Sequence, residues 1–150
     1  MLKNAQSDEA KAIAQHYLYE HAGVQPCADF QALFWVDEND RIEWVIGYTA
    51  FIGKTCQMHM VNLKGGYTPK GLLFAAFDYP FNFLGMEKTF GIVNSLNTKA
   101  MEYDKKLGFK EAIRFPGMHC DGGDLVVFEM NKAVCRWIRE RVKNETELVS

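Results

Sequence analysis

The stretch from Val93 to Phe109, VNSLNTKAMEYDKKLGF, constrains the fold more than any other part of the chain. It reads as a strand end, a polar turn, one amphipathic helix, a glycine stop and the start of another strand. Asn97 can cap free backbone N–H groups at the helix start. Lys106 before Gly108 is typical of a helix end followed by a left-handed residue. A helix between two strands predicts a crossover, so the β-α-β-α-β middle of the chain should contain parallel neighbouring strands, with antiparallel hairpins on either side.

Hydrophobic periodicity and turn residues predict the remaining elements. A first helix begins at Asp8 with Ser7 as its cap and ends at Gly23, and no strand is expected before it. A second helix begins at Pro69 with Thr68 as its cap, becomes irregular at Pro80 and ends at Gly85. The predicted strands are Gln31–Val36, Arg41–Phe51, Thr55–Asn62, Lys88–Asn94, Phe109–Phe115 and Leu125–Met130, and a last helix is predicted over Lys132–Lys143.

The composition is that of a globular protein. The chain has 150 residues, of which 48% are hydrophobic and 24% charged. This suffices for one domain with a hydrophobic core, and the core also accounts for the 13% of aromatic residues. The net charge of -2 predicts no general attraction to nucleic acid or to an acidic membrane. The chain starts with a short polar segment and contains no membrane-spanning run, so we expect a cytoplasmic protein with free thiols.

The four cysteines lie far apart and form no C-x-x-C pair. Cys56 and His59, together with His119 and Cys120, could be the two halves of a zinc site. Residues three apart on a strand point to opposite faces of the sheet, however, so Cys56 and His59 cannot both reach one ion if their segment is a strand. We therefore predict no metal.

The segment between the strand Thr55–Asn62 and the second helix, KGGYTP, is a candidate anion site. Free N–H groups at a helix start point at a ligand, and the helix dipole favours negative charge there. Gly65 and Gly66 allow a close approach of the backbone, and Lys64 and Lys70 add positive charge. Glycine-containing loops of this kind are also common without a ligand, and the segment matches neither GxxxxGK[ST] nor GxGxxG.

The loop and the pattern N-x-x-A-x-x-x-x-K-x-L-G-F, which begins at Asn97, together resemble the acyl-CoA-binding region of the GNAT acyltransferase superfamily. The similarity extends from about Thr55 to Met130. The stretch AFDYPF, Ala76–Phe81, is similar to short, RimJ-like and phage-type members. The resemblance implies an α+β (α/β) fold with a mixed, mostly antiparallel central sheet that contains one parallel splayed pair and is flanked by helices.

The resemblance also implies an N-acyltransferase in which a primary amine attacks the thioester of acetyl-CoA directly, with no metal. The phosphates would lie on the loop, the pantetheine arm between the splayed strands, and the thioester carbonyl on a backbone N–H. The implied cofactor-binding residues are Met60, Val61, Lys64, Gly65, Gly66, Thr68, Lys70, Gly71, Asn94 and Asn97. For Asn97, a helix cap is an alternative role that can coexist with binding.

The candidate catalytic residues are His59, Tyr103, Asp104 and His119. In many members of the superfamily a helix tyrosine protonates the leaving thiolate, and Asp104 takes the position of that tyrosine here. Tyr103 is one residue away and should point about 100° away on the helix. His59 is a candidate base or a packed strand histidine, His119 a candidate base or a solvated loop residue. Asp104 could alternatively bind a cationic substrate or be an ordinary exposed carboxylate.

The acceptor is expected to be an amine of a small molecule or a protein, and edge-strand homodimers are frequent in the superfamily. A catalytically silent binding or structural protein with the same fold is the alternative, with the last helix as its partner surface. Nucleic-acid binding through the basic face of that helix is disfavoured by the net charge. We expect residues 1–131 to form the acyltransferase domain and residues 132–150 a helical extension with a frayed tail.

Overall fold

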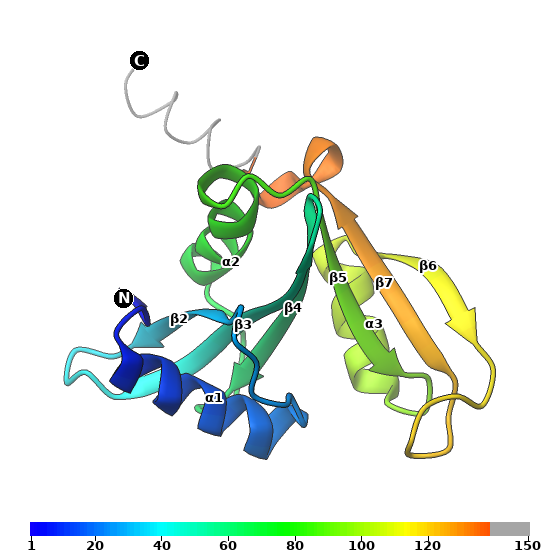
Figure 1. Cartoon of the computed structure of the whole chain (residues 1–150), viewed down its shortest axis with the longest axis horizontal. Coiled ribbons are helices and arrows are strands. Elements are labelled where there is room, and N and C mark those ends of the chain that lie inside the picture. The colour runs from blue at the N-terminus through cyan, green and yellow to red at the C-terminus, as the bar shows by residue number, and fades with distance from the viewer. Residues whose placement is uncertain (139–150) are drawn as a thin grey trace.

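The computed structural model describes residues 1–138 as one mixed seven-stranded sheet with helices on both faces (Figure 1). The strand order is β1-β2-β3-β4-β5-β7-β6, and every neighbouring pair is antiparallel except β4 with β5. This confirms the predicted fold class. The strands are β1 (Leu2–Asn4), β2 (Gln31–Val36), β3 (Ile42–Ile52), β4 (Thr55–Asn62), β5 (Lys88–Asn94), β6 (Lys110–Phe115) and β7 (Leu125–Asn131). The helices are α1 (Asp8–Ala22), α2 (Lys70–Asp78) and α3 (Thr98–Leu107).

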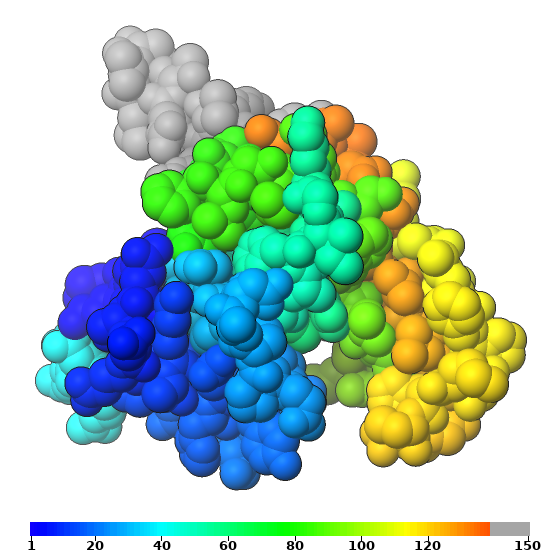
Figure 2. All heavy atoms as spheres, viewed as in Figure 1, coloured from blue at the N-terminus to red at the C-terminus, as the bar shows by residue number. Residues whose placement is uncertain are grey.

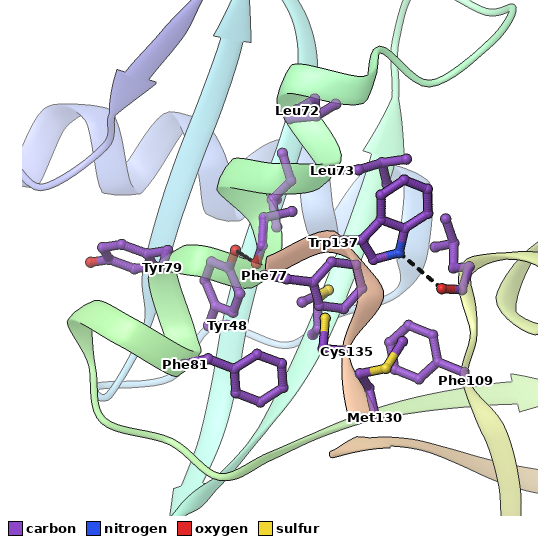
Figure 3. Packing of buried hydrophobic residues seen from close by; sticks show 14 of the residues in the cluster. Tyr48, Leu72, Leu73, Phe77, Tyr79, Phe81, Phe109, Met130, Cys135 and Trp137 are labelled. Carbon is purple, nitrogen blue, oxygen red and sulfur yellow. Dashed lines mark hydrogen bonds between the residues drawn. The ribbon is translucent and has the colours of Figure 1, made fainter. Parts of the chain in front are cut away.

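Two hydrophobic clusters hold the helices against the sheet. On one face, Ala14 and Leu18 of α1 pack with buried residues of β2, β3 and β4. On the other face, α2 and α3 pack with the rest of the sheet around a group of aromatic rings (Figure 3). The buried Tyr48 hydroxyl donates to the Ala76 carbonyl at 2.5 Å, so this hydroxyl is paired within the core.

The only parallel pair in the described sheet is short. β4 and β5 are in register at three positions, from Thr55 opposite Lys88 to Gln57 opposite Phe90, and separate beyond them. β5 instead pairs with β7 along its whole length, and β4 pairs with β3. The second crossover, through α3, also joins parallel strands, but β7 lies between β5 and β6. Within the described sheet, the expectation of parallel neighbours holds at the first crossover and is wrong at the second, because β7 pairs with both β5 and β6.

Several local predictions are confirmed. Ser7 caps α1, its hydroxyl oxygen accepting from the N–H of Ala10 at 3.1 Å, and Gly23 ends that helix in the left-handed region at φ 66°. Pro80 lies in an irregular π-helical turn, Tyr79–Phe83, that follows α2. The pyrrolidine ring removes one backbone donor, which explains the departure from α-helical bonding at this point.

Three local predictions are wrong. A strand does precede α1, because Leu2–Asn4 pairs antiparallel with β2. Thr68 does not cap α2, whose N-cap residue is Pro69, with no side-chain hydrogen bond at the cap. The predicted helix from Lys132 is interrupted, because Lys132–Val134 form a 3-10 turn and Cys135 is extended (φ -71°, ψ 108°). Cys135 is fully buried in the core, and this anchoring takes precedence over helical periodicity.

Residues 136–138 resume a helix, and Trp137 packs into the core against Phe74 of α2 and Leu107 of α3. The Trp137 indole N–H donates to the Leu107 carbonyl at 2.9 Å, one of the two dashed contacts in Figure 3. The remainder of the predicted helix to Lys143, its basic outer face and the tail lie outside the described residues. None of the helices within residues 1–138 has the length and apolar run needed to cross a bilayer.

Candidate functional site

A cleft of about 720 Å³ opens where β4 and β5 separate. Its walls come from the second half of β4, the second half of β5, one side of α3, the end of α1 and the loop that contains His119. Figure 2 shows the hollow between the end of α1, in blue, and the loop after β6, in yellow. The cleft therefore combines segments that are distant in the sequence but adjacent at the fork of the sheet.

A second cavity of about 480 Å³ adjoins the cleft on the α1 side. It extends to Asp29, Thr49 and Gln57, and it shares His59 and His119 with the cleft. Two ligands could thus approach each other from opposite sides of the sheet, with these two histidines beside the place where they meet.

His59 lies on β4 opposite Gly47 and faces α1. Its Nε2 atom lies 2.8 Å from the Thr49 hydroxyl oxygen, and burial lowers the pKa of the imidazole to about 4. The ring is therefore neutral at neutral pH. An efficient general base has a pKa near the working pH, so this value favours the interpretation of His59 as a packed, hydrogen-bonded histidine.

Tyr103 on α3 reaches back to the loop that precedes α2. Its hydroxyl lies 2.7 Å from the Thr68 hydroxyl, and burial raises the pKa of the phenol despite this hydrogen bond. Thr68 therefore links the candidate anion loop to the cleft instead of capping the helix. Tyr103 and Asp104 both line the cleft, although they are consecutive on the helix.

Asp104 faces β5 across the cleft. Gly91 is the first residue of β5 beyond the last parallel pair, and a Cβ atom there would lie 3.3 Å from the Asp104 Oδ2 atom. Burial raises the pKa of this carboxyl to about 7. The carboxyl has no hydrogen bond or ion pair with another described residue. Asp104 is thus not the exposed helix carboxylate that was one of the sequence-based alternatives.

The candidate anion loop is shaped by Asn62, a residue that the sequence analysis did not identify. The Asn62 side-chain oxygen accepts from the N–H groups of Lys64 (3.1 Å) and Gly65 (2.9 Å), and its amide donates to the Gly66 carbonyl (3.1 Å). Gly65 and Gly66 both have positive φ, 85° and 82°. An asparagine three residues before a glycine pair is the signal that could have revealed this turn.

The contacts of Asn62 leave the later part of the loop as the donor surface. No described acceptor contacts the backbone N–H groups of Gly66, Tyr67, Thr68, Lys70 and Gly71. The Lys64 Nζ atom lies 3.1 Å from the Glu43 Oε2 atom, so this ammonium group is already paired with a carboxylate. Lys70 is the first residue of α2. The site available to an anion is thus the segment from Gly66 to Gly71, with Pro69 contributing no donor.

The other predicted cofactor residues divide between the cleft and the core. Met60, Asn94 and Asn97 line the cleft, whereas the Val61 side chain is buried under α1. Asn97 caps α3, its side-chain oxygen accepting from the N–H of Ala100 at 3.1 Å, which confirms the predicted cap. Asn94 accepts from the N–H of Leu96 and so shapes the turn before that helix.

The structure confirms that Cys56 and His59 lie on opposite faces, because Cys56 is fully buried in the α2 and α3 core. None of the four cysteines, which all lie within the described residues, forms a disulfide. Within residues 1–138, the one group of potential metal ligands is His119, Cys120 and Asp121, whose ligand atoms lie within 4.8 Å of one another at the mouth of the cleft. Three consecutive, mostly exposed loop residues do not by themselves define a metal site, and the prediction of no metal stays a prediction.

Known proteins resemble this chain in fold but not in sequence. No family model and no curated protein matches the sequence. The structure matches a mutant of spermidine N-acetyltransferase from Vibrio cholerae with a TM-score of 0.74 at 13% identity, over 94% of this chain and 97% of that one.

Two further solved structures are similar. Spermidine N-acetyltransferase from Vibrio cholerae in complex with CoA and spermine matches with a TM-score of 0.69 at 13% identity, over 89% of this chain and 95% of that chain. A candidate phosphinothricin N-acetyltransferase matches with a TM-score of 0.67 at 20% identity, over 87% and 98%. At these identities the likeness concerns the fold, and this chain has the GNAT acyltransferase fold that its motifs indicated.

Proposed function

We propose that this protein transfers an acetyl group from acetyl-CoA to a primary amine. The observation that carries the proposal is the fork of the sheet, which leaves one edge of β4 without a partner among the described strands from Met58 to Asn62. An extended chain with amide groups, such as the pantetheine arm of CoA, can hydrogen-bond to such an edge as an added strand does. A protein of the same fold, 13% identical, has been solved with CoA and spermine, which supports the proposal.

The diphosphate of CoA would bind at the start of α2. The free N–H groups between Gly66 and Gly71 and the positive end of the helix dipole suit an anion, and Lys70 adds a positive charge. Lys64 and Gly65 would act indirectly, because Asn62 uses their N–H groups to hold the turn.

The thioester would lie deeper in the cleft. Alternate residues of an antiparallel strand direct their N–H groups to the same edge, so either Met60 or Val61 presents a donor to the thioester carbonyl. Asn94 and Asn97 would contact the pantetheine arm from the opposite wall. The amine would enter through the cavity on the α1 side, where His59 can orient it and His119 or water can accept its proton.

Within the superfamily, we infer the closest relation to the RimJ-like, phage-type members. The support is the AFDYPF stretch, which forms the end of α2 and the π-helical turn and in which the rings of Phe77 and Phe81 stack at 6.3 Å. The acceptor remains an amine of a small molecule or a protein. An edge-strand homodimer and the absence of a nucleic-acid partner stay predictions.

Calorimetric titration with acetyl-CoA tests the proposal. We expect micromolar binding to the wild type and at least tenfold weaker binding to Gly66→Glu, because a carboxylate at this loop position repels the diphosphate. Gly53→Glu is the matched control: Gly53 also has positive φ and open space around it, but it lies in the β3–β4 turn at the other end of β4. The control variant should bind acetyl-CoA like the wild type.

Binding then justifies a turnover assay. Release of free CoA thiol should be measured with spermidine, spermine and phosphinothricin, the amines named for proteins of this fold, and with a peptide that has a free N-terminus. No binding at millimolar acetyl-CoA would refute the proposal. Micromolar binding without turnover on any amine would favour the catalytically silent alternative.

A further inference from the structure

Of the two carboxyl groups that line the cleft within residues 1–138, Asp104 lies at the point where β4 and β5 part and Asp121 lies in the loop at the mouth. The last parallel pair is Gln57 with Phe90, and the Asp104 carboxyl lies against the next residue, Gly91. Any side chain at position 91 would crowd this carboxyl, since even a Cβ atom would lie 3.3 Å from Oδ2. The glycine therefore leaves room for a carboxyl group at the vertex of the fork.

The geometry also fixes which end of a bound chain reaches Asp104. A ligand with its phosphates at the start of α2 would enter beside Asn62 and run along the open edge of β4 toward Gln57. These residues are five apart, about 17 Å along a strand. The end of the arm that is remote from the phosphates, which carries the sulfur, would then lie at the fork.

Tyr103 precedes Asp104 on α3 and also carries an acidic proton, but its hydroxyl has a different contact. The Tyr103 hydroxyl is paired with the Thr68 hydroxyl of the loop at 2.7 Å, which directs it toward the phosphate end of the cleft. The Asp104 carboxyl has no hydrogen-bond or ion-pair partner among residues 1–138. An unpaired carboxyl in a partly dehydrated cleft favours its neutral form, which is a proton donor.

We propose that Asp104, as a neutral carboxylic acid, donates its proton to the sulfur of CoA when the thioester bond breaks. This inference rests on the proposed function. The amine nitrogen forms a bond to the acetyl carbon, the C–S bond breaks, and its electron pair stays on sulfur. Sulfur then takes the Asp104 proton, the amine releases one proton to solvent, and the Asp104 carboxylate regains a proton from solvent. A pKa of about 7 makes transfer to a thiolate, whose conjugate thiol has a pKa of about 8.5, favourable.

The test compares Asp104→Asn with Glu102→Gln. Both variants exchange a carboxyl for an amide on α3, but Glu102 is exposed and does not line the cleft. The first readout is independent of turnover: the thiolate absorbance of bound CoA is followed as pH is raised. In the wild type the Asp104 carboxylate beside the sulfur should oppose thiol ionisation, so the fraction of thiolate at pH 8 should be several-fold lower than in Asp104→Asn.

The second readout is turnover with an amine that the wild type accepts. We expect Asp104→Asn to lower kcat by about 100-fold or more, as for loss of a general acid, with the affinity for acetyl-CoA unchanged. At saturating amine, kcat/KM for acetyl-CoA should fall above about pH 7 in the wild type and lack that fall in Asp104→Asn. Other groups that face the cleft can titrate and are the same in both proteins: His21, His59, Tyr103, His119, Cys120 and Asp121.

The outcomes are distinguishable. If the wild type does not bind CoA, the proposed function fails and this inference fails with it. If CoA binds and the bound thiol ionises identically in wild type and Asp104→Asn, Asp104 is not beside the sulfur and only this inference is overturned. Equal loss of turnover in Asp104→Asn and Glu102→Gln would also overturn it, because the effect would then be one of helix charge.

Discussion

Replacing Asp104 by Asn should stabilise the protein at pH 8 but not at pH 4. Most folded carboxyls have a lowered pKa and stabilise the fold when ionised, whereas burial raises the pKa of Asp104 from 3.8 to about 7. Between these two values the folded state binds more protons than the unfolded state, so the free energy of unfolding falls as pH rises. Asn resembles the neutral carboxyl in shape and never ionises, so the variant escapes this loss.

The magnitude follows from the two pKa values. Between pH 4 and pH 8 the full difference corresponds to about 4 kcal/mol, and the remaining solvent exposure of the carboxyl reduces the expectation to about 2–4 kcal/mol. Urea denaturation followed by tryptophan fluorescence would give the free energy of unfolding of both proteins at both pH values. The difference between variant and wild type is the informative quantity, because titration of other groups contributes equally to both.

Glu102→Gln serves as the control here as well, with an expected change below about 0.5 kcal/mol at either pH because the side chain is exposed. A difference between Asp104→Asn and the wild type that is the same at pH 4 and pH 8 would show that the carboxyl ionises normally in the folded protein. The argument from burial would then be wrong, and the proton-donor role of Asp104 would lose its physical basis.

Three further predictions concern stability. Relative to His59→Gln, the wild type should gain about 3 kcal/mol as pH rises from 4 to 6.5, since the folded pKa of His59 is about 4 and the unfolded chain binds a proton up to pH 6.5; urea denaturation of both proteins gives this difference, from which the opposing titration of Asp104 cancels. Trp137→Phe leaves the buried Leu107 carbonyl without its donor and should cost about 1–2 kcal/mol in the same assay, whereas no loss would mean that water replaces the indole. Ser7→Ala removes the cap of α1 and should cost about 1 kcal/mol, measured by thermal unfolding, with Ser7→Asn close to the wild type.

Local signals in the sequence predicted most of the elements and part of the site. Helix starts and stops depend on a few neighbouring residues, which is why Ser7, Gly23, Asn97 and Gly108 marked their boundaries correctly. The candidate loop was recognised from its glycines and lysines. The role of Asn62 was not predicted, although its hydrogen bonds to Lys64 and Gly65 are local.

What the sequence by itself determined is therefore most of the elements, the mixed class of the sheet and the residue types available for chemistry. The tertiary structure alone decided the insertion of β7 beside β5, the pairing of β1 and the anchoring of Cys135, since strand pairing and burial depend on contacts between distant segments. It also decided the character of the site. The pKa of His59 is lowered, which disfavours the histidine as the base, and the pKa of Asp104 is raised above that of an ordinary carboxylate. Burial causes both shifts, and burial is a property of the packed cleft.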